Sequence, residues 1–197
     1  MKITVLTPNY NGGRWLARGM DSVLAQELAP GDELEYLFLD GGSTDDSLKI
    51  AEARRARLAA LVSEKDDGPA DALNKGFARA TGELVGWLNA DDVYRPGALA
   101  KAIAAAKAHP RAAFFFGKCR IVDEAGAEIR GFPTFVKNAC FPFSSRFLIQ
   151  CINYVSQPAS WFRRSALAAA GGLRTDFKAA WDYDLTLRLW RQGGGVR

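Results

Sequence analysis

Carboxylate and amide side chains follow several of the short apolar segments in this sequence. Asp40 ends one such segment, and Asn89, Asp91 and Asp92 stand at the end of another. Oxygen atoms of this kind bind hard divalent cations, which keep their other positions for water and phosphate oxygens. Each group taken alone also fits a turn or a helix cap, since Asp and Asn are common in both.

Further polar groups have the same placement, one after the first apolar run and one after the third. They are Thr7 with Pro8 and Asn9, and Asp66 with Gly68. Because ligands of an open α/β sheet bind outside the carboxyl ends of the strands, we expect all these groups to meet at one edge. Their shared placement favours a binding site over a set of unrelated turns.

The second half of the chain adds Asp182, in the segment AWDYDLTLRL. Asp182 and Asp184 are two positions apart on a predicted helix over 180–194, where side chains diverge by about 200°. Both therefore cannot face one site. Arg188 can pair with Asp184 four residues away. We expect Asp184 to be structural, and Asp182 either to cap the helix or to face a cleft as a general base.

The elements that must position these residues alternate along the first 110 residues. Apolar and β-branched segments predict strands over 2–7, 35–40, part of 60–64, and 83–89. Periodicity, glycines and prolines predict helices over 14–27, 45–61 and 95–110, the second capped by Ser43 or Thr44, and a turn that continues as a helix over 66–82. This alternation is typical of a doubly wound, mostly parallel α/β sheet.

The pattern changes after residue 110. Residues 112–132 predict two strands joined by a hairpin turn at 124–126. Residues 132–160 show little periodicity, which predicts an irregular, partner-facing segment. Their phenylalanines fit core packing or, alternatively, an acceptor-binding or membrane-facing surface. The sequence reaches Arg197 where a further strand is expected, so we expect this half to continue beyond it.

Composition and short motifs exclude several classes of protein. The loop PNYNGGRW has neither G-x-G-x-x-G nor the P-loop pattern, which disfavours hydride transfer and triphosphate hydrolysis by those routes. A single histidine and three cysteines without paired spacing favour Mg²⁺ or Mn²⁺ over zinc, and a reducing cytoplasm. The net charge of +4 suits anionic ligands or an anionic membrane surface but is too small to indicate nucleic acid.

The N-terminal segment lacks the pattern of a signal peptide. No stretch reaches the ~18 apolar residues of a membrane span. We therefore expect a cytoplasmic protein, with peripheral association at the inner membrane face left open.

Taken together, the motifs resemble the family 2 glycosyltransferases of the GT-A fold. The matching segments are TVLTPNYNGGRWL, LFLDGGSTDDS, SEKDDGPADALNKGFARATGELVGWLNADDVYRPGAL, QPASWFRRSAL and AAWDYDLTLRL. The resemblance implies one Rossmann-like GT-A domain over 1–197. Residues 1–110 would form its nucleotide-sugar-binding half, and residues 111–197 a smaller, mixed or antiparallel acceptor-binding half.

The resemblance also implies individual roles on the donor side. The implied nucleotide-sugar-binding residues are Thr7, Pro8, Asn9, Asp40, Asp66, Gly68, Asn74 and Asn89. Among them, Asp40 would read the base and Asn89 would lie near the ribose, while Lys75 lies in the helix beside Asn74.

Asn89-Ala90-Asp91 matches the DxD motif, so Asp91 would hold Mg²⁺ or Mn²⁺, and Asp182 matches the expected catalytic base. Asn89 replaces the first aspartate of the motif, and Trp181 replaces the glutamate that normally precedes the base.

The expected activity is that of an inverting glycosyltransferase acting in cell-surface polysaccharide or glycolipid synthesis. It would transfer a sugar from a nucleotide-diphosphate sugar to a hydroxyl of a saccharide or lipid-linked acceptor. The two departures leave a non-catalytic nucleotide-binding or scaffold subunit as an alternative. A sugar nucleotidyltransferase is a second alternative, although NYNGGRW is a poor match to its glycine-rich, basic loop. The sequence identifies neither the sugar, the base nor the acceptor.

Overall fold

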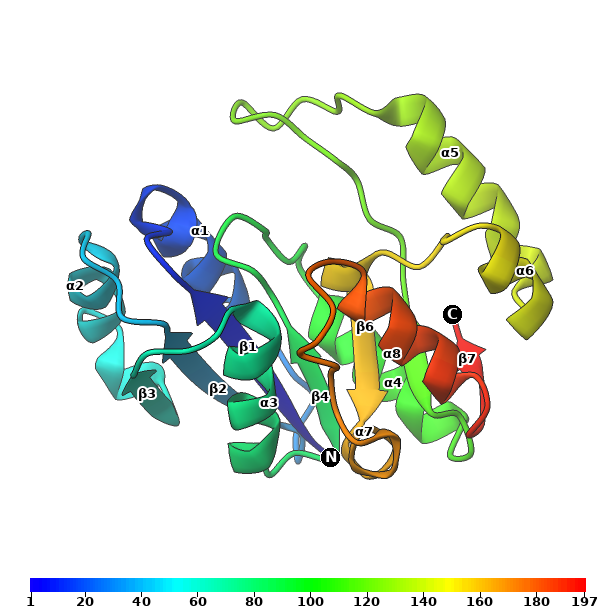
Figure 1. Cartoon of the computed structure of the whole chain (residues 1–197), viewed down its shortest axis with the longest axis horizontal. Helices are drawn as coiled ribbons and strands as arrows, with labels where there is room; N and C mark the ends of the chain where they lie inside the picture. The colour runs from blue at the N-terminus through cyan, green and yellow to red at the C-terminus, as the bar shows by residue number, and fades with distance from the viewer.

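The computed structural model describes residues 1–197 and contains one seven-stranded sheet (Figure 1). The strand order is β3-β2-β1-β4-β6-β5-β7. The strands are β1 (Lys2–Asn9), β2 (Glu33–Asp40), β3 (Ala60–Ser63), β4 (Leu84–Trp87), β5 (Phe114–Phe116), β6 (Ser160–Arg163) and β7 (Gly195–Val196). The first four are parallel, and only β6 runs against its neighbours. This confirms the predicted mostly parallel α/β sheet with a mixed C-terminal part.

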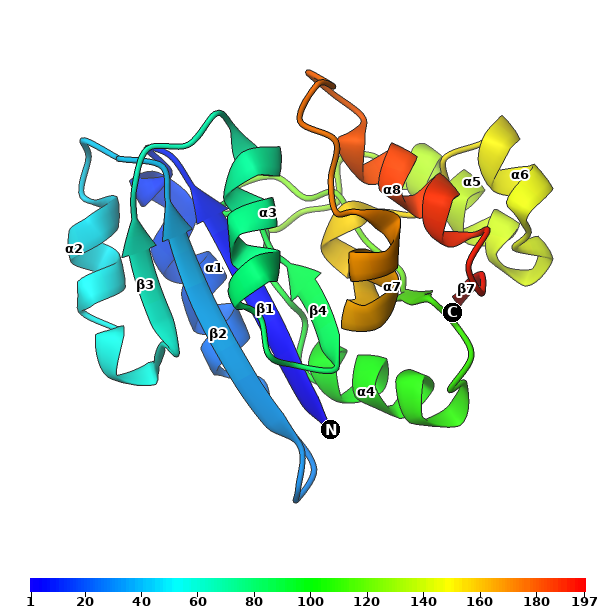
Figure 2. The same ribbon diagram turned by 60° about the horizontal axis from the view of Figure 1, so that its bottom comes forward.

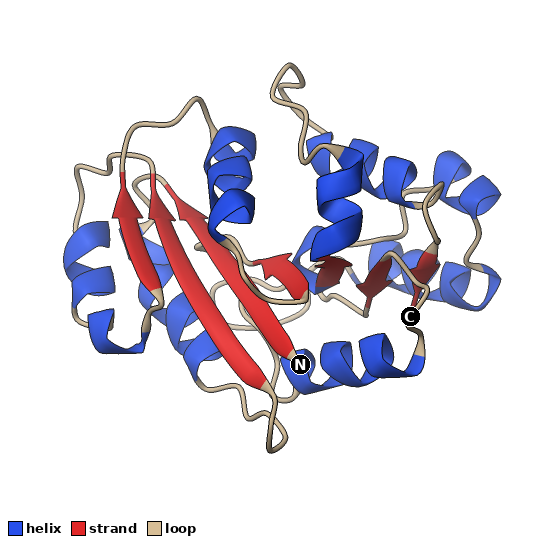
Figure 3. Ribbon diagram, turned by 90° about the horizontal axis from the view of Figure 1, so that it is seen from below, coloured by secondary structure: helices blue, strands red, loops and turns tan.

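Helices cover both faces of the sheet (Figure 3). The first layer contains α1 (Gly13–Leu24), α2 (Ser47–Glu52) and α4 (Ala98–Ala108), and the second contains α3 (Pro69–Arg79), α7 (Arg164–Ala170) and α8 (Trp181–Leu189). Figure 2 shows the second layer in front of the strands. Alternate strand residues supply the two cores, so that Phe115 packs on the first layer while Phe114 and Phe116 pack on the second.

Residues 112–160 differ from the prediction. The turn at 124–126 forms, but its two arms share only one isolated antiparallel bridge, between Val122 and Glu128. The predicted second strand is therefore wrong. Of residues 112–132, only β5 joins the sheet, and the turn itself is exposed.

The segment predicted to be irregular contains two helices, α5 (Gly131–Cys140) and α6 (Arg146–Cys151). Figure 1 shows them set off from the sheet, at the upper right. Each helix has one buried residue, Thr134 in α5 and Ile149 in α6. The apolar residues Phe132, Phe135, Val136 and Ala139 of α5 recur at helical spacing, a signal that the prediction of an irregular segment overlooked, and α6 has only six residues and is too short to show a period. None of the helices has the length and apolar character needed to cross a bilayer.

Candidate active site

The polar groups at the ends of the first three strands contact one another. The Nδ2 of Asn9 donates to the Oδ1 of Asp40 over 3.1 Å. Asp66 accepts a hydrogen bond from the N–H of Gly68 and lies so close to Gly41 that a Cβ there would be 2.5 Å from its Oδ2. The predicted convergence of these strand ends is thus present in the fold.

Asp40 is enclosed by hydrogen-bond donors. Its Oδ1 accepts from Asn9 and from the Oγ of Ser43 at 2.5 Å, and its Oδ2 accepts from the Oγ of Ser63 at 2.9 Å. Burial by itself raises the pKa of this carboxyl, but the hydrogen bonds from Ser43, Asn9 and Ser63 outweigh it and hold the pKa below its usual value. The ionised carboxylate of Asp40 therefore holds Asn9, Ser43 and Ser63 together at this edge of the sheet.

Ser43 or Thr44 was predicted to cap the second helix, and that prediction is wrong. The helix α2 begins only at Ser47, and no side chain caps it. The hydroxyl of Ser43 is used instead by Asp40, and it also accepts from the N–H of Asn11 at 2.8 Å. Ser43 therefore bonds the carboxylate of Asp40 at the end of β2 and does not cap the helix.

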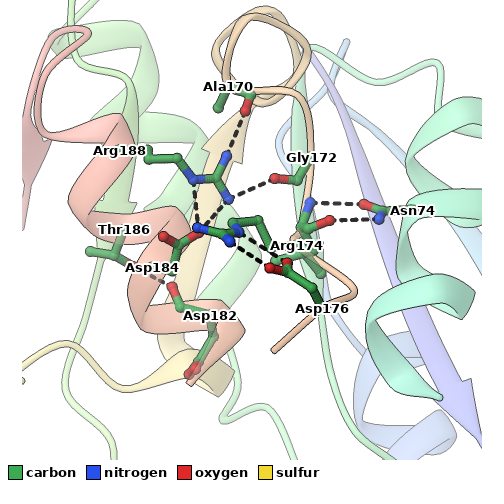
Figure 4. A network of polar contacts seen from close by, with 10 residues as sticks. Asn74, Ala170, Gly172, Arg174, Asp176, Asp182, Asp184, Thr186 and Arg188 are labelled. Atoms are coloured by element: carbon green, nitrogen blue, oxygen red, sulfur yellow. Dashed lines mark hydrogen bonds and ion pairs between the residues drawn. The ribbon is translucent and has the colours of Figure 1, made fainter. Parts of the chain in front are cut away.

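Two predicted nucleotide-side residues have partners inside the protein. The hydroxyls of Thr7 and Tyr36 share a buried hydrogen bond of 2.9 Å, and Pro8 beside them is also buried. The amide of Asn74 both donates to and accepts from the backbone of Leu173, each over 2.8 Å (Figure 4). These side chains serve the fold, and their contact with a nucleotide stays a prediction.

The segment Asn89–Asp92 forms a turn at the end of β4, closed by a hydrogen bond from the N–H of Asp92 to the carbonyl of Asn89. Gly19 of α1 lies directly against this turn. A Cβ there would be 3.0 and 3.1 Å from the carbonyl oxygens of residues 90 and 92. The helix α4 begins only after Gly97 and has no side-chain cap. The helix-cap interpretation of the two aspartates is therefore wrong.

The side chains of Asp91 and Asp92 lie in different surroundings. Asp91 is exposed and lines an open groove, whose other walls are Trp15 and Arg18 of α1 and the acidic turn at 123–124. The carboxylate of Asp92 has no hydrogen-bond donor. Burial, and then the charge of Asp91, raise its pKa to about 6. The sequence analysis names Asp92 among the strand-end carboxylates but assigns the metal to Asp91 alone, although the adjacency of the two residues was a usable signal.

These residues fit a divalent cation whose shell is completed by a ligand. Two adjacent carboxylates without donors are a place where a cation relieves repulsion. No group of three or more His, Cys, Asp or Glu side chains forms a closed metal site. Asp91 and Asp92 would therefore supply part of the shell, and phosphate or water oxygens the rest.

Asp182 lies in the first turn of α8 and lines a small pocket beyond the end of β4. Trp87, Gln157, Ser160 and Tyr183 are among the other walls. The carboxylate of Asp182 makes no hydrogen bond within the protein, and it points away from the polar network in Figure 4. The residue before α8 is Ala180, so Asp182 is not the cap. Asp182 therefore lines this pocket instead, and its role as a general base stays a prediction.

Asp184 is structural, as predicted. The Nε and Nη2 of Arg188 both lie 2.8 Å from the Oδ2 of Asp184. Arg188 also donates to the carbonyls of Ala170 and Gly172, at 2.5 and 2.8 Å (Figure 4). The pair therefore ties α8 to the end of α7.

Gln157 connects the turn at residues 89–92 to the pocket of Asp182, and sequence analysis did not single it out. Its Nε2 donates to the carbonyl of Trp87 over 2.9 Å, and its Oε1 accepts from the Nδ2 of Asn89 over 3.2 Å. It also lines the pocket of Asp182. The available signal was its place at the start of QPASWFRRSAL, one of the matching motifs.

The fold is shared with solved glycosyltransferase structures. TarS 1–349 of S. aureus aligns over 100% of this chain and 57% of its own, with a TM-score of 0.80 and 23% identity. The mannosyltransferase PcManGT of Pyrobaculum calidifontis, solved with GDP-Man and Mn²⁺, covers 98% of this chain and 53% of its own, with a TM-score of 0.75 and 22% identity. The fold of this chain is thus that of the GT-A glycosyltransferases.

The model of glycosyl transferase family 2 matches residues 4–170, and the chain belongs to that family. An O-antigen biosynthesis protein of Myxococcus xanthus, RfbC, is 33% identical over 194 residues, which are 95% of this chain and 14% of RfbC. An uncharacterized glycosyltransferase of Mycobacterium tuberculosis is 32% identical over 94% of this chain and 68% of its own. The resemblance drawn from the motifs is confirmed, and the chain spans only part of each relative.

Proposed function

We propose that this chain is an inverting glycosyltransferase that uses a nucleotide-diphosphate sugar as donor. The observation that carries the proposal is the position of Gln157. This residue bonds Asn89 of the strand-end turn and lines the pocket of Asp182. A donor bound at the turn would therefore present its sugar close to an unpaired carboxylate. That proximity is what transfer to an acceptor hydroxyl requires.

In the proposed reaction, Asp182 acts as the general base. Its carboxylate takes the proton of the acceptor hydroxyl, and the oxygen attacks the anomeric carbon from the face opposite the diphosphate. A new carbon–oxygen bond forms while the bond to the diphosphate breaks, and the diphosphate leaves with the electron pair. Mg²⁺ or Mn²⁺ held by Asp91, with Asp92 beside it, would neutralise charge on that leaving group.

The donor site proposed here consists of the strand-end residues. Asn9 bonds Asp40 at the ends of β1 and β2, Asp66 bonds Gly68 in the loop after β3, and Asn89 lies at the end of β4. Backbone groups near Thr7, Pro8 and Asn74 would complete the wall, since the side chains there are buried or already bonded. Residues 1–110 would thus serve the donor and residues 111–197 the acceptor.

The proposed acceptor is a saccharide or a lipid-linked saccharide, as in cell-surface polysaccharide synthesis.

The helices α5 and α6 and the residues beside them expose four phenylalanines at 68–77%: Phe132, Phe135, Phe143 and Phe147. Residues 129–175 contain no Asp or Glu, while Arg130 and Arg146 are exposed beside the phenylalanines. Apolar side chains edged by cations suit an anionic lipid surface, so we propose peripheral contact with a membrane through this aromatic face.

Donor binding can be tested by thermal unfolding with UDP-, GDP- and dTDP-sugars, with and without Mn²⁺. One nucleotide class should raise Tm by roughly 5–10 °C at a concentration of about 100 Kd, since the ligand binds only the folded state. EDTA, or the substitution Asp91→Asn, should remove the shift because the diphosphate loses its cation. Glu52→Gln, an exposed carboxylate on α2, is the control that should keep it.

The two parts of this proposal fail separately. If no sugar nucleotide shifts the wild-type protein, the donor assignment is wrong. If the shift persists in EDTA and in Asp91→Asn, the donor assignment stands and the metal assignment is wrong.

A further inference from the structure

We propose that Gln157 is a positioning residue, which orients the amide of Asn89 so that its Oδ1 faces the donor. This inference rests on the proposed function. It concerns the residue that replaces the first aspartate of the DxD motif, and it explains how this chain accommodates an amide there.

The orientation follows from one backbone group. The carbonyl of Trp87 is only an acceptor, so the end of the Gln157 amide that meets it at 2.9 Å must be the NH₂ group. The Oε1 of Gln157 is then directed to Asn89, 3.2 Å away, and requires a donor there. The NH₂ group of Asn89 supplies it. The Oδ1 of Asn89 consequently points elsewhere, and it accepts no hydrogen bond within the protein.

The end of a sheet ladder explains why Gln157 has this place. The antiparallel pairing of β4 with β6 stops at Gly86 opposite Trp161. One residue further on, the carbonyl of Trp87 has no strand partner, and Gln157 provides its donor from the short helical turn Gln157–Ala159. The same side chain therefore completes the sheet and sets the first residue of the donor turn.

The pair also explains what an aspartate at position 89 would meet. Its carboxylate oxygen would face the Oε1 of Gln157 with no proton between them. A flip of the Gln157 amide would remove that clash, but it would place Oε1 against the carbonyl of Trp87. Asn89 and Gln157 are thus a matched pair. The free Oδ1 of Asn89 is an acceptor suited to a hydroxyl of the donor, such as one on the ribose.

A double-mutant cycle tests this inference. Wild type, Gln157→Ala, Asn89→Ala and the double variant are compared in affinity for UDP-N-acetylglucosamine or GDP-mannose with Mn²⁺, whichever binds the wild type, by calorimetry. Gln157→Ala should weaken binding about tenfold in the wild type, the value of one oriented hydrogen bond, and less than about twofold in Asn89→Ala. The loss of unfolding free energy caused by Gln157→Ala should be similar in both backgrounds.

The variant Asn89→Asp gives a second readout, because the effect of removing Gln157 on donor affinity should have the opposite sign in that background. Removing Gln157 should lower donor affinity in the wild type but raise it in Asn89→Asp, because there it removes the clash of two acceptors. Gln157→Met retains the side-chain volume and replaces the alanine variant if that does not fold.

Equal losses of affinity in both backgrounds, or no loss in the wild type, would overturn the role of Gln157 while leaving the proposed function intact. A wild-type protein that binds no sugar nucleotide would refute the proposed function and this inference with it.

Discussion

Asp182 and Asp184 stand two positions apart in the first turns of α8, and their carboxylates have different surroundings. Asp184 is held by Arg188, which also binds the end of α7. Asp182 has no partner within the protein and lines the pocket beside Trp87 and Gln157. A paired carboxylate stabilises the fold, whereas an unpaired one in a pocket is available to take a proton.

This contrast predicts opposite results for two matched substitutions. Asp182→Asn should lower kcat by about 10²–10⁴, the usual contribution of a general base, with unchanged Tm and donor Kd. Asp184→Asn should lower Tm, because Arg188 loses its ion pair, while folded protein keeps its kcat. Steady-state kinetics, calorimetry and thermal unfolding of both variants check this. Near-normal turnover in Asp182→Asn would show that another group is the base.

At the scale of elements, a buried glutamate fastens the sheet at the end opposite the site. Glu35 of β2 accepts hydrogen bonds from the hydroxyl of Thr4 in β1 at 2.6 Å and from the backbone and hydroxyl of Thr81 at 2.7 and 2.5 Å. Burial alone raises the pKa of Glu35. The hydrogen bonds from Thr4, Thr81 and Lys2 nevertheless bring it down to about 2. The charged form of Glu35 thus holds β1, β2 and the start of β4 in register.

Because its folded pKa lies below its ordinary value of 4.5, Glu35 contributes stability above pH 4.5 that is lost as pH falls towards 2. Glu35→Gln should lower the unfolding free energy at pH 7 by about 2 kcal/mol, the value of charged hydrogen bonds. Its difference from wild type should shrink between pH 5 and pH 2. Urea unfolding at several pH values measures this. Glu33→Gln, exposed on the same strand, is the control, and a pH-independent difference would contradict the assignment.

At the scale of the whole molecule, the aromatic face of α5 and α6 predicts where the protein contacts a membrane. Wild type should co-sediment with phosphatidylglycerol vesicles more than with phosphatidylcholine vesicles, and added salt should weaken this. The double variant Phe143→Ser, Phe147→Ser should have an affinity for phosphatidylglycerol vesicles at least about tenfold lower, since each substitution removes a phenylalanine side chain that would be buried in the lipid. Ile121→Ser, exposed outside these helices, is the control.

Equal binding to both vesicle types would contradict the membrane assignment. Loss of self-association in the double variant, measured by analytical ultracentrifugation, would show instead that a second copy covers this face.

The elements β1, β2, β4, α1 and α4 were predicted well because each buries one or both of its faces. The segments at β1, β2 and β4 are apolar, and α1 and α4 carry regular buried positions, so local pattern and tertiary packing agree. The helix predicted over 45–61 is wrong beyond Glu52, where α2 ends and only a short helical turn over Arg55–Arg57 follows, with no buried residue. The prediction failed at α5 and α6, which bury little, and at Ser43, which binds a distant acceptor instead of a nearby helix end. The site residue Gln157 was missed because its role depends on Trp87 and Asn89, which lie far from it in the sequence.

The sequence by itself determined the alternation of strands and helices, the family, and the types of residue at the strand ends, because periodicity and motif spacing are local properties. Only the tertiary structure decided which polar atoms are free. Thr7 and Asn74 are bonded within the fold, Asp182 is not, and the amide of Asn89 takes its orientation from Gln157, 68 positions away. Hydrogen bonding between distant segments depends on how the layers pack, and no local pattern contains that information.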